Sequence, residues 1–276
     1  MERLNKVGEK EQSGIQQHEK RPEGVITTRL SGEQPFVIVF DRTDSHERYY
    51  FGGSQLWLLK PNGVQGGCGT VAAANILAYL ALNRGEEWKQ LYPFSDTSRD
   101  HFIQHMESVY RVVKPLPLPN EIHWVPGNII KSVPSSLGIP GLSFFSKRLV
   151  RYGTAKGVTL YPVWRDRKER PHLNTSLQMS VHQAVEYIRQ GLGSGCPVAM
   201  INTWNPALKA VSHRIDETTG ATTVNDFQRH WVVITTLLEN QKTGQVFIEV
   251  SSWGYRVNLN LSSLWGKGYS GLIYFR

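Results

Sequence analysis

The strongest pattern in the chain is one long apolar run in its front third. Residues 71–82, VAAANILAYLAL, are apolar on nearly every face, which predicts a helix that is buried all round. The run follows a turn signal at residues 61–63, Pro-Asn-Gly, and the glycine-rich string Gly66-Gly67-Cys68-Gly69. The sequence therefore predicts a core helix that begins close to a cysteine.

Two further helices are predicted from apolar spacing. Over residues 98–113, Phe102, Met106 and Val109 repeat at helical intervals. Ser180 followed by Gln183 forms a capping-box pattern, which predicts a third helix that ends at residue 191 or 193. We also expect a short helix over residues 128–137, in a stretch rich in proline and glycine.

The remaining apolar stretches read as strands. An early one is expected at residues 36–40, FVIVF, and another at 158–163. The later ones are expected at residues 197–203, 230–238, 246–251, 255–259 and 271–275. Helices that come mostly before strands are typical of an α+β domain. Residues 1–34, polar and poor in apolar residues, are interpreted as a flexible N-terminal arm, and residues 35–276 as a single domain.

Composition narrows the functional classes. The 276 residues are 40% hydrophobic and 11% aromatic, as expected of a folded protein. No apolar run reaches the roughly 18 residues that cross a bilayer, and residues 1–34 lack an apolar signal core, so we expect no membrane span and a cytoplasmic location. The two cysteines, Cys68 and Cys196, fit a reduced compartment and have no neighbouring histidines. We expect neither a metal site nor a cofactor.

The positive charge is concentrated in one segment. Residues 147–170 hold eight basic and two acidic residues, which is most of the net charge of +8. Such a segment is either a solvated surface or a field that attracts an acidic partner. Tyrosine and tryptophan lie among the basic residues, as in surfaces that stack on bases, but no recognised nucleic-acid module accompanies them. A peptide substrate of acidic character is the preferred partner, and the oligomeric state is left open.

Cys68 is placed where a thiol ionises readily. The first turn of a helix carries unpaired N–H groups and a partial positive charge, which stabilise a thiolate. Gly67 and Gly69 beside it let the backbone turn and leave room for a substrate carbonyl. A free cysteine is also a common small core residue, so this position alone does not establish a nucleophile.

A histidine and a polar strand end complete the pattern. His230 opens the strand-like run His-Trp-Val-Val-Ile-Thr, and an imidazole held on rigid sheet is a suitable base for a helix-borne thiol. Ser251, in the later string Ser-Ser-Trp-Gly, is the candidate that orients the imidazole, and Trp253 could shield that hydrogen bond from water. The order of these three strings is more specific than any one of them.

The strings around Cys68, His230 and Ser251 resemble the papain-like cysteine peptidase superfamily. The similarity is greatest to its bacterial branch of bacteriocin-leader (double-glycine) peptidases, and it covers roughly residues 61–275. The resemblance implies a helical subdomain that carries the nucleophile, packed on an antiparallel sheet that carries the base. It also implies Cys68, His230 and Ser251 as the catalytic residues, with the reaction in a cleft between the two parts.

Two positions depart from the pattern of that superfamily. Its third catalytic residue is usually Asn or Asp, whereas Ser251 stands there in this chain. The glutamine of its oxyanion hole usually precedes the cysteine by six residues, where this chain has Asn62, and Gln65 lies three residues before Cys68. Either amide is a candidate oxyanion donor together with the Cys68 backbone N–H.

The resemblance favours a thiol hydrolase that cleaves an amide bond, most simply a peptide bond, through a Cys-His acyl-enzyme. Two alternatives remain open from the sequence. An acyltransferase or transpeptidase would use the same Cys68–His230 pair and pass the acyl group to an amine. A non-catalytic papain-like binding protein would explain Ser251 and the unusual spacing before Cys68.

Overall fold

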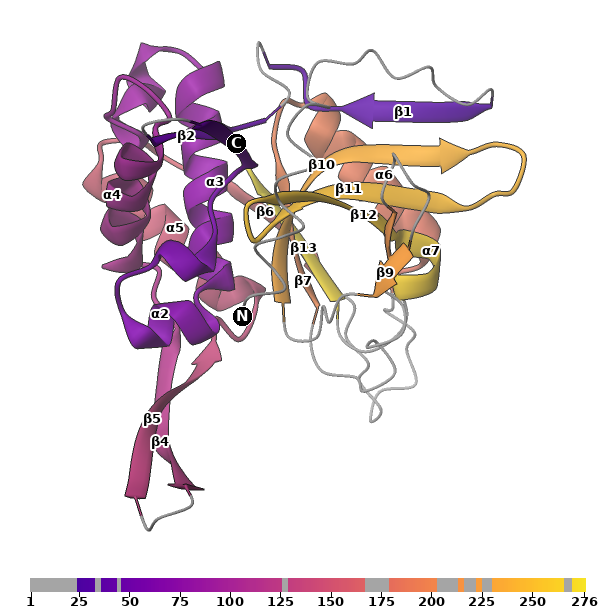
Figure 1. Ribbon diagram of the computed structural model, residues 1–276. Coiled ribbons are helices and arrows are strands. Elements are labelled where there is room, and N and C mark those ends of the chain that lie inside the picture. The colour runs from indigo at the N-terminus through magenta and orange to yellow at the C-terminus, as the bar shows by residue number, and fades with distance from the viewer. Residues whose placement is uncertain are drawn as a thin grey trace.

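The computed structural model describes residues 24–32, 36–43, 46–125, 129–166, 179–202, 213–215, 222–224, 230–265 and 270–276. Within these ranges, helices gather on one side of the molecule and a curved sheet on the other (Figure 1). The helical side holds α2 (Pro61–Gly66), α3 (Cys68–Asn83), α4 (Arg99–Tyr110) and α5 (Leu142–Ala155), with short turns η2 (Gln55–Trp57) and η3 (Glu86–Leu91). The predicted α+β class is confirmed, with a helical part packed on an antiparallel sheet.

Helix α3 is the centre of the helical side. All of residues 68–81 are buried, as the unbroken apolar run predicted. Helix α4 and turn η3 pack on one side of α3, and strand β10 of the sheet packs on another. The first residue of this enclosed helix is Cys68.

The main sheet has seven antiparallel strands in the order β12-β11-β10-β7-β13-β6, with β1 pairing to β10 off this path. Their bounds are β1 Val25–Arg29, β6 Pro162–Asp166, β7 Val198–Asn202, β10 His230–Asn240, β11 Val246–Ser252, β12 Tyr255–Asn260 and β13 Ser270–Phe275. Strand β7 pairs with the first half of β10, and β1 pairs with its second half. Strand β10, which starts at His230, therefore has hydrogen-bonded partners on both of its edges.

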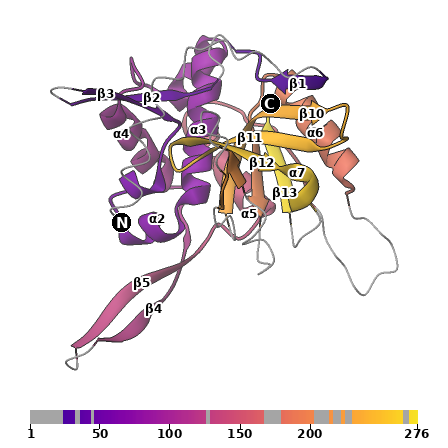
Figure 2. The same ribbon diagram turned by 45° about the vertical axis from the view of Figure 1, so that its right-hand side comes forward.

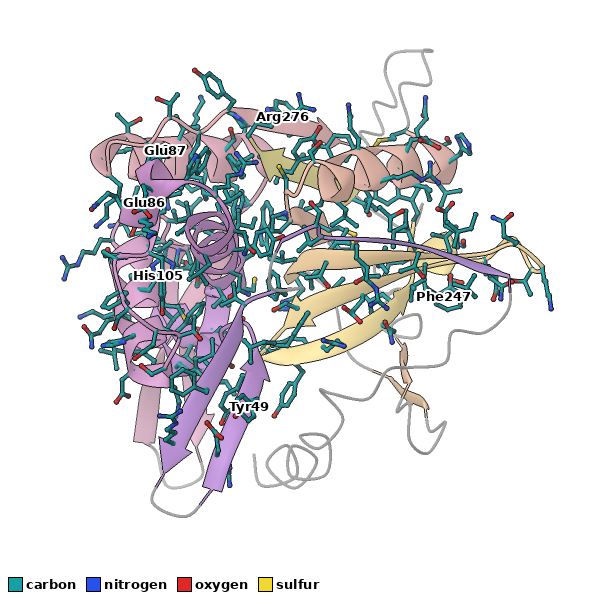
Figure 3. All side chains as sticks on the ribbon, turned by 90° about the horizontal axis from the view of Figure 1, so that it is seen from above. Tyr49, Glu86, Glu87, His105, Phe247 and Arg276 are labelled. Atoms are coloured by element: carbon teal, nitrogen blue, oxygen red, sulfur yellow. The ribbon has the colours of Figure 1, made fainter. Side chains whose placement is uncertain are left out.

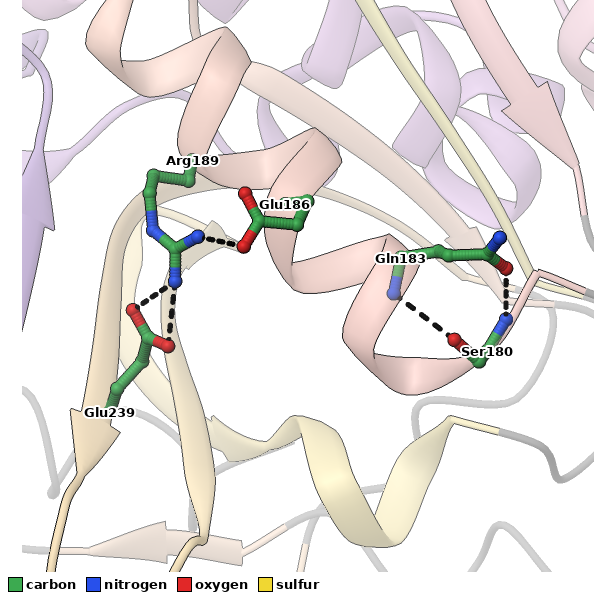
Figure 4. A network of polar contacts seen from close by, with 5 residues as sticks. All are labelled: Ser180, Gln183, Glu186, Arg189 and Glu239. Atoms are coloured by element: carbon green, nitrogen blue, oxygen red, sulfur yellow. Dashed lines mark hydrogen bonds and ion pairs between the residues drawn. The ribbon is translucent and has the colours of Figure 1, made fainter.

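Helix α6 (Val181–Gly193) covers the face of the sheet opposite to the helical side (Figure 2). The predicted capping box at Ser180 and Gln183 is confirmed, with both of its hydrogen bonds present. Farther along the helix, Arg189 forms an ion pair with Glu186 and a two-pronged pair with Glu239 of β10, at 2.7 and 2.8 Å (Figure 4). This network connects the second half of α6 to β10.

Smaller elements surround this body. Strands β2 (Ile38–Thr43) and β3 (His46–Phe51) form one hairpin, and β8 (His213–Ile215) and β9 (Thr222–Val224) form another. Helix α7 (Leu261–Leu264) follows β12. Strands β4 (Leu116–Val125) and β5 (Ile129–Gly138) form a two-stranded ribbon that extends away from the body (Figure 1).

Several expectations about local structure are wrong. The helix expected over residues 128–137 is strand β5, because this stretch is rich in β-branched residues and pairs with β4. The turn expected at residues 61–63 is the start of helix α2, where proline occupies the first helical position. The arm expected over residues 1–34 is too long, since Val25–Arg29 is a strand of the sheet. Its residues 1–23 lie outside the described part of the chain.

The basic segment also has a different structure from the one expected. Residues 147–155, which hold several of its cations, belong to helix α5, whose apolar face packs on β6 and β13. Within residues 147–166, the described part of the segment, Pro162–Asp166 is the stretch that forms a strand. Residues 167–170 lie outside the described part.

A buried histidine inside the helical side makes stability depend on pH. His105 of α4 lies within the helical side (Figure 3). It is fully buried against Tyr92 and Phe102, and its Nε2 lies 3.0 Å from the Ala74 carbonyl oxygen. Its Nδ1 has no hydrogen-bond partner among the described residues. Burial lowers the pKa of His105 from 6.5 to about 4, so the folded protein holds this imidazole neutral.

We expect the buried, neutral His105 to lower the stability of the folded protein in acid. Between about pH 6.5 and 4 the unfolded chain binds a proton at this site that the folded chain does not, so the free energy of unfolding falls as the pH falls. The full loss from this group is about 3 kcal/mol. Urea denaturation at several pH values should show a shallower pH slope for His105→Phe than for the wild type. Equal slopes would contradict the neutral buried imidazole.

Candidate active site

The two residues of the predicted catalytic pair line one small cavity. Cys68, at the start of α3, and His230, at the start of β10, both border it and are 9% and 6% exposed. Its volume is about 10 Å³, at the margin of what one water molecule needs. The fold therefore brings together a thiol and an imidazole from positions far apart in the sequence.

Backbone donors face the thiol. Burial raises the pKa of the Cys68 thiol, while the backbone N–H groups of Trp231, Gly69 and Cys68 itself act in the opposite direction. Burial is the larger influence. The first-turn position that predicted a ready thiolate is thus offset by desolvation, and Cys68 rests as a neutral thiol.

Burial also holds the imidazole neutral. It lowers the pKa of His230 from 6.5 to about 3. A ring nitrogen, Nε2, lies 2.8 Å from the Ser252 hydroxyl oxygen. When Nε2 carries the proton and donates it to Ser252, Nδ1 is the nitrogen with a lone pair, which is the state a general base requires.

The residue that orients His230 is Ser252, whereas the sequence pointed to Ser251. Successive side chains of a strand point to opposite faces, and Ser251 pairs with Val233, which lies on the same face as Trp231. Ser252 therefore shares the face of His230. Ser251 also lines the cavity, but its hydroxyl donates to the Phe51 carbonyl at 2.6 Å.

Trp253 stacks on the imidazole of His230. Its ring stacks on that of His230 with centroids 4.2 Å apart and an interplanar angle of 19°. Trp253 has φ of 52° and Gly254 has φ of 81°, the pattern of a tight hairpin turn between β11 and β12. Positive φ costs a tryptophan about 1–2 kcal/mol, so this backbone is strained at the place where the ring meets His230.

The predicted oxyanion residues are not at the cavity. Gln65 is exposed on α2 and Asn62 is half-buried there, and neither is among the described residues that line the cavity. Gln55 does line the cavity, and its Nε2 donates to the Val64 carbonyl at 3.1 Å. Gln55 was missed because it lies 13 residues before Cys68, outside the glycine-rich string.

The glycines beside Cys68 serve close packing. A Cβ atom on Gly67 would lie 2.3 Å from the Gly63 carbonyl oxygen, and one on Gly69 would lie 2.7 Å from Ile139. The φ of Gly67 is −81°, which other residues adopt freely. The predicted room for a substrate carbonyl is therefore filled, on these two glycines, by neighbouring protein.

A second missed residue is Asn75, which lies two turns after Cys68 on α3. It is 1% exposed and lines the cavity. Within an apolar run a single asparagine gives little sign of function, but a buried amide must have hydrogen-bond partners. Both ends of this amide are in fact bonded, one of them to Ser251.

The described residues can also be searched for a metal site, a membrane-spanning helix and a second reactive thiol. They contain no group of three or more His, Cys, Asp or Glu side chains that could hold a metal ion. Among them, no helix combines the length and apolar character that crossing a membrane requires. The second cysteine, Cys196, is buried, and its sulfur accepts a hydrogen bond from Arg84 at 3.1 Å.

Comparisons with known proteins give distant similarity only. No protein-family model matches the chain, and a search of curated proteins finds no match. Among solved structures, the chain is similar to one described as the crystal structure of UfSP from C. elegans, with 12% identity and a TM-score of 0.43. The match covers 93% of this chain and 35% of that chain, so this chain spans about a third of the length of its match.

We expect His230 to remain neutral in mild acid. Because its pKa is about 3, its ring signals in NMR should not titrate between pH 5 and 8, and Nε2 should carry the proton. Trp253→Ala removes the covering ring, admits water and should raise the pKa of His230 toward 6.5. Trp253→Phe, which keeps an aromatic cover, is the matched control. A wild-type His230 that titrates near 6.5 would contradict this description.

Proposed function

We propose that the protein is a thiol hydrolase that cleaves an amide bond, most simply a peptide bond, with Cys68 as nucleophile and His230 as base. The observation that carries the proposal is that both side chains line one cavity while the Ser252 hydroxyl lies 2.8 Å from Nε2 of the imidazole. A nucleophile, its base and an orienting group are the three parts of such a site.

The proposed reaction begins with a neutral pair. Nδ1 of His230 takes the thiol proton as the Cys68 sulfur attacks the substrate carbonyl carbon. The tetrahedral intermediate then collapses, the C–N bond breaks, and the leaving amine takes the proton from His230. This leaves a thioester on Cys68. Water attacks the thioester, His230 accepts its proton and returns it to the sulfur, and a carboxylic acid leaves.

Charge develops on two groups during the attack. The imidazolium would lie against the face of Trp253, where a ring stabilises a cation by about 0.5–2 kcal/mol. For the oxyanion we propose the Cys68 backbone N–H and the Gln55 amide as donors. One Nε2 hydrogen of Gln55 is used by Val64, which holds the amide in place and leaves a second hydrogen on the same nitrogen.

One observation favours a non-catalytic alternative. The cavity is small, and burial opposes ionisation of both Cys68 and His230. A papain-like protein that binds a partner without cleaving it would show the same features. Acyl transfer to an amine is chemically equivalent to hydrolysis up to the thioester, and product analysis with added amine separates the two.

We expect a peptide-like electrophile, such as a peptidyl vinyl sulfone, to label Cys68 and to depend on His230. Cys68→Ala should abolish labelling, and His230→Ala should reduce its rate by about 10²–10⁴-fold, the usual contribution of a general base. Mass spectrometry of the labelled peptide gives the site and the rate. Cys196→Ser is the matched control and should label like the wild type. Labelling at the same rate without His230 would favour the binding alternative.

Gln55 provides a test of the oxyanion assignment. Gln55→Ala should lower the rate of peptide hydrolysis by about 10²–10³-fold, the usual effect of losing one oxyanion donor. Gln65→Ala, on the exposed side of α2, should leave the rate unchanged. Steady-state kinetics of both variants, with a peptide substrate selected from a peptide library, would measure the two rates. The reverse ranking would return the role to Gln65.

A further inference from the structure

A buried hydrogen-bond relay connects the helix of Cys68 with two other segments of the site. Asn75 Oδ1 accepts a hydrogen bond from the Gly53 backbone N–H at 2.9 Å, and Asn75 Nδ2 donates to the Ser251 hydroxyl at 3.2 Å. Ser251 in turn donates its hydroxyl hydrogen to the Phe51 carbonyl oxygen at 2.6 Å. The relay thus runs from the segment of residues 51–53 through α3 to the end of β11 and back to that segment.

Asn75, Ser251 and Gly53 each lie on the same segment of chain as a residue of the proposed reaction. Asn75 lies seven residues after Cys68, which is two helical turns, so both lie along one side of α3. Ser251 precedes Ser252, which contacts His230. Gly53 precedes Gln55 by two residues. The relay therefore connects the three segments that carry Cys68, Ser252 and Gln55.

The segment around residue 52 packs closely against the relay. Gly52 has φ of +78°, and a Cβ atom there would lie 2.6 Å from the Ser251 hydroxyl and 2.7 Å from Asn75 Nδ2. The same segment is bonded on both sides, because Gly52 N–H donates to Val37 and Phe51 N–H donates to the Gly254 carbonyl at 2.8 Å. The turn that carries Trp253 is thereby connected to the relay as well.

The hydrogen bond between Asn75 and Ser251 can run in one direction only. Ser251 gives its one hydrogen to Phe51, so toward Asn75 it can act only as an acceptor, and Asn75 must present its NH₂ group. The Asn75 oxygen is then the atom left for Gly53. An asparagine meets both demands at once, whereas aspartate could accept from Gly53 but not donate to Ser251.

We propose that Asn75 and Ser251 are positioning residues that set the Cys68 thiol relative to His230 and Gln55. This inference rests on the proposed function and goes beyond it, because neither residue touches the reacting atoms in the mechanism above. It also gives Ser251 a different role from the one that the sequence suggested.

The test compares variants in rate and in structure. Asn75→Ala and Asn75→Asp should each lower the second-order rate of Cys68 labelling by a peptidyl vinyl sulfone, on the order of ten- to a hundredfold, because small misplacements of reacting groups cost that much. In a peptidase assay kcat should fall while KM stays nearly constant. Ser251→Ala should reduce the rate in the same direction, and the double variant Asn75→Ala/Ser251→Ala should lose less than the product of the two single losses.

Thr70→Val is the matched control for loss of a buried hydrogen bond on the same helix. The Thr70 hydroxyl donates to the Val113 carbonyl at 2.5 Å, away from the relay. This variant should lose stability but keep the labelling rate. If Thr70→Val slows labelling as much as Asn75→Ala does, or if the two single losses multiply fully in the double variant, the positioning role is wrong.

Amide hydrogen exchange separates this inference from the proposed function. The Gly53 N–H should be protected in the wild type and should exchange faster in Asn75→Ala, while helix α6 keeps its protection. Labelling that is independent of His230 in the wild type would contradict the proposed function even if Gly53 behaves as expected. His230-dependent labelling that is unaffected in Asn75→Ala would overturn the positioning role alone.

Discussion

The complete burial of helix α3 is the constraint on which the rest of the structure depends. Because residues 68–81 are enclosed by the other helices on one side and by β10 on the other, the helix can neither turn nor slide without opening the core. Its first residue, Cys68, is therefore fixed against the first residues of β10. The position of the thiol is determined by packing along the whole of this helix.

The same burial determines the electrostatics of the site. It raises the pKa of Cys68 and lowers that of His230, so the resting pair is neutral and charge forms only during attack. Hydrogen-bond donors fixed in advance are most effective in such a dry site, because they need not reorient when charge appears. The Trp231 N–H beside the sulfur and the Trp253 ring on the imidazole are groups of this kind.

Elements with a strong periodic signal were predictable from the sequence. The apolar run indicated α3, the capping box at Ser180 indicated α6, and shorter apolar stretches indicated most strands of the main sheet. Residues 129–138 were misread because proline and glycine obscured a strand that depends on pairing with β4 and packing on α2. The start of α2 was misread because Pro-Asn-Gly occurs in turns as well as in first helical turns.

The site was predictable in its residue types and less so in its contacts. Cys68, His230 and Trp253 could be found because each lies in a short string with a chemical reason. The choice between Ser251 and Ser252 required the register of β11 against β10, which the sequence does not specify. Gln55 and Asn75 come from outside these strings and reach the cavity only through the packing of η2 and α3.

The central claim is that the Cys68 thiol and the His230 imidazole lie within reach of one small molecule. Dibromoacetone tests it directly, because it carries an electrophilic carbon on either side of one ketone and can join two nucleophiles. Mass spectrometry after digestion should find a single crosslinked pair, Cys68 to His230. Alkylation of Cys68 without any link to His230, under conditions where the protein stays folded, would contradict the claim.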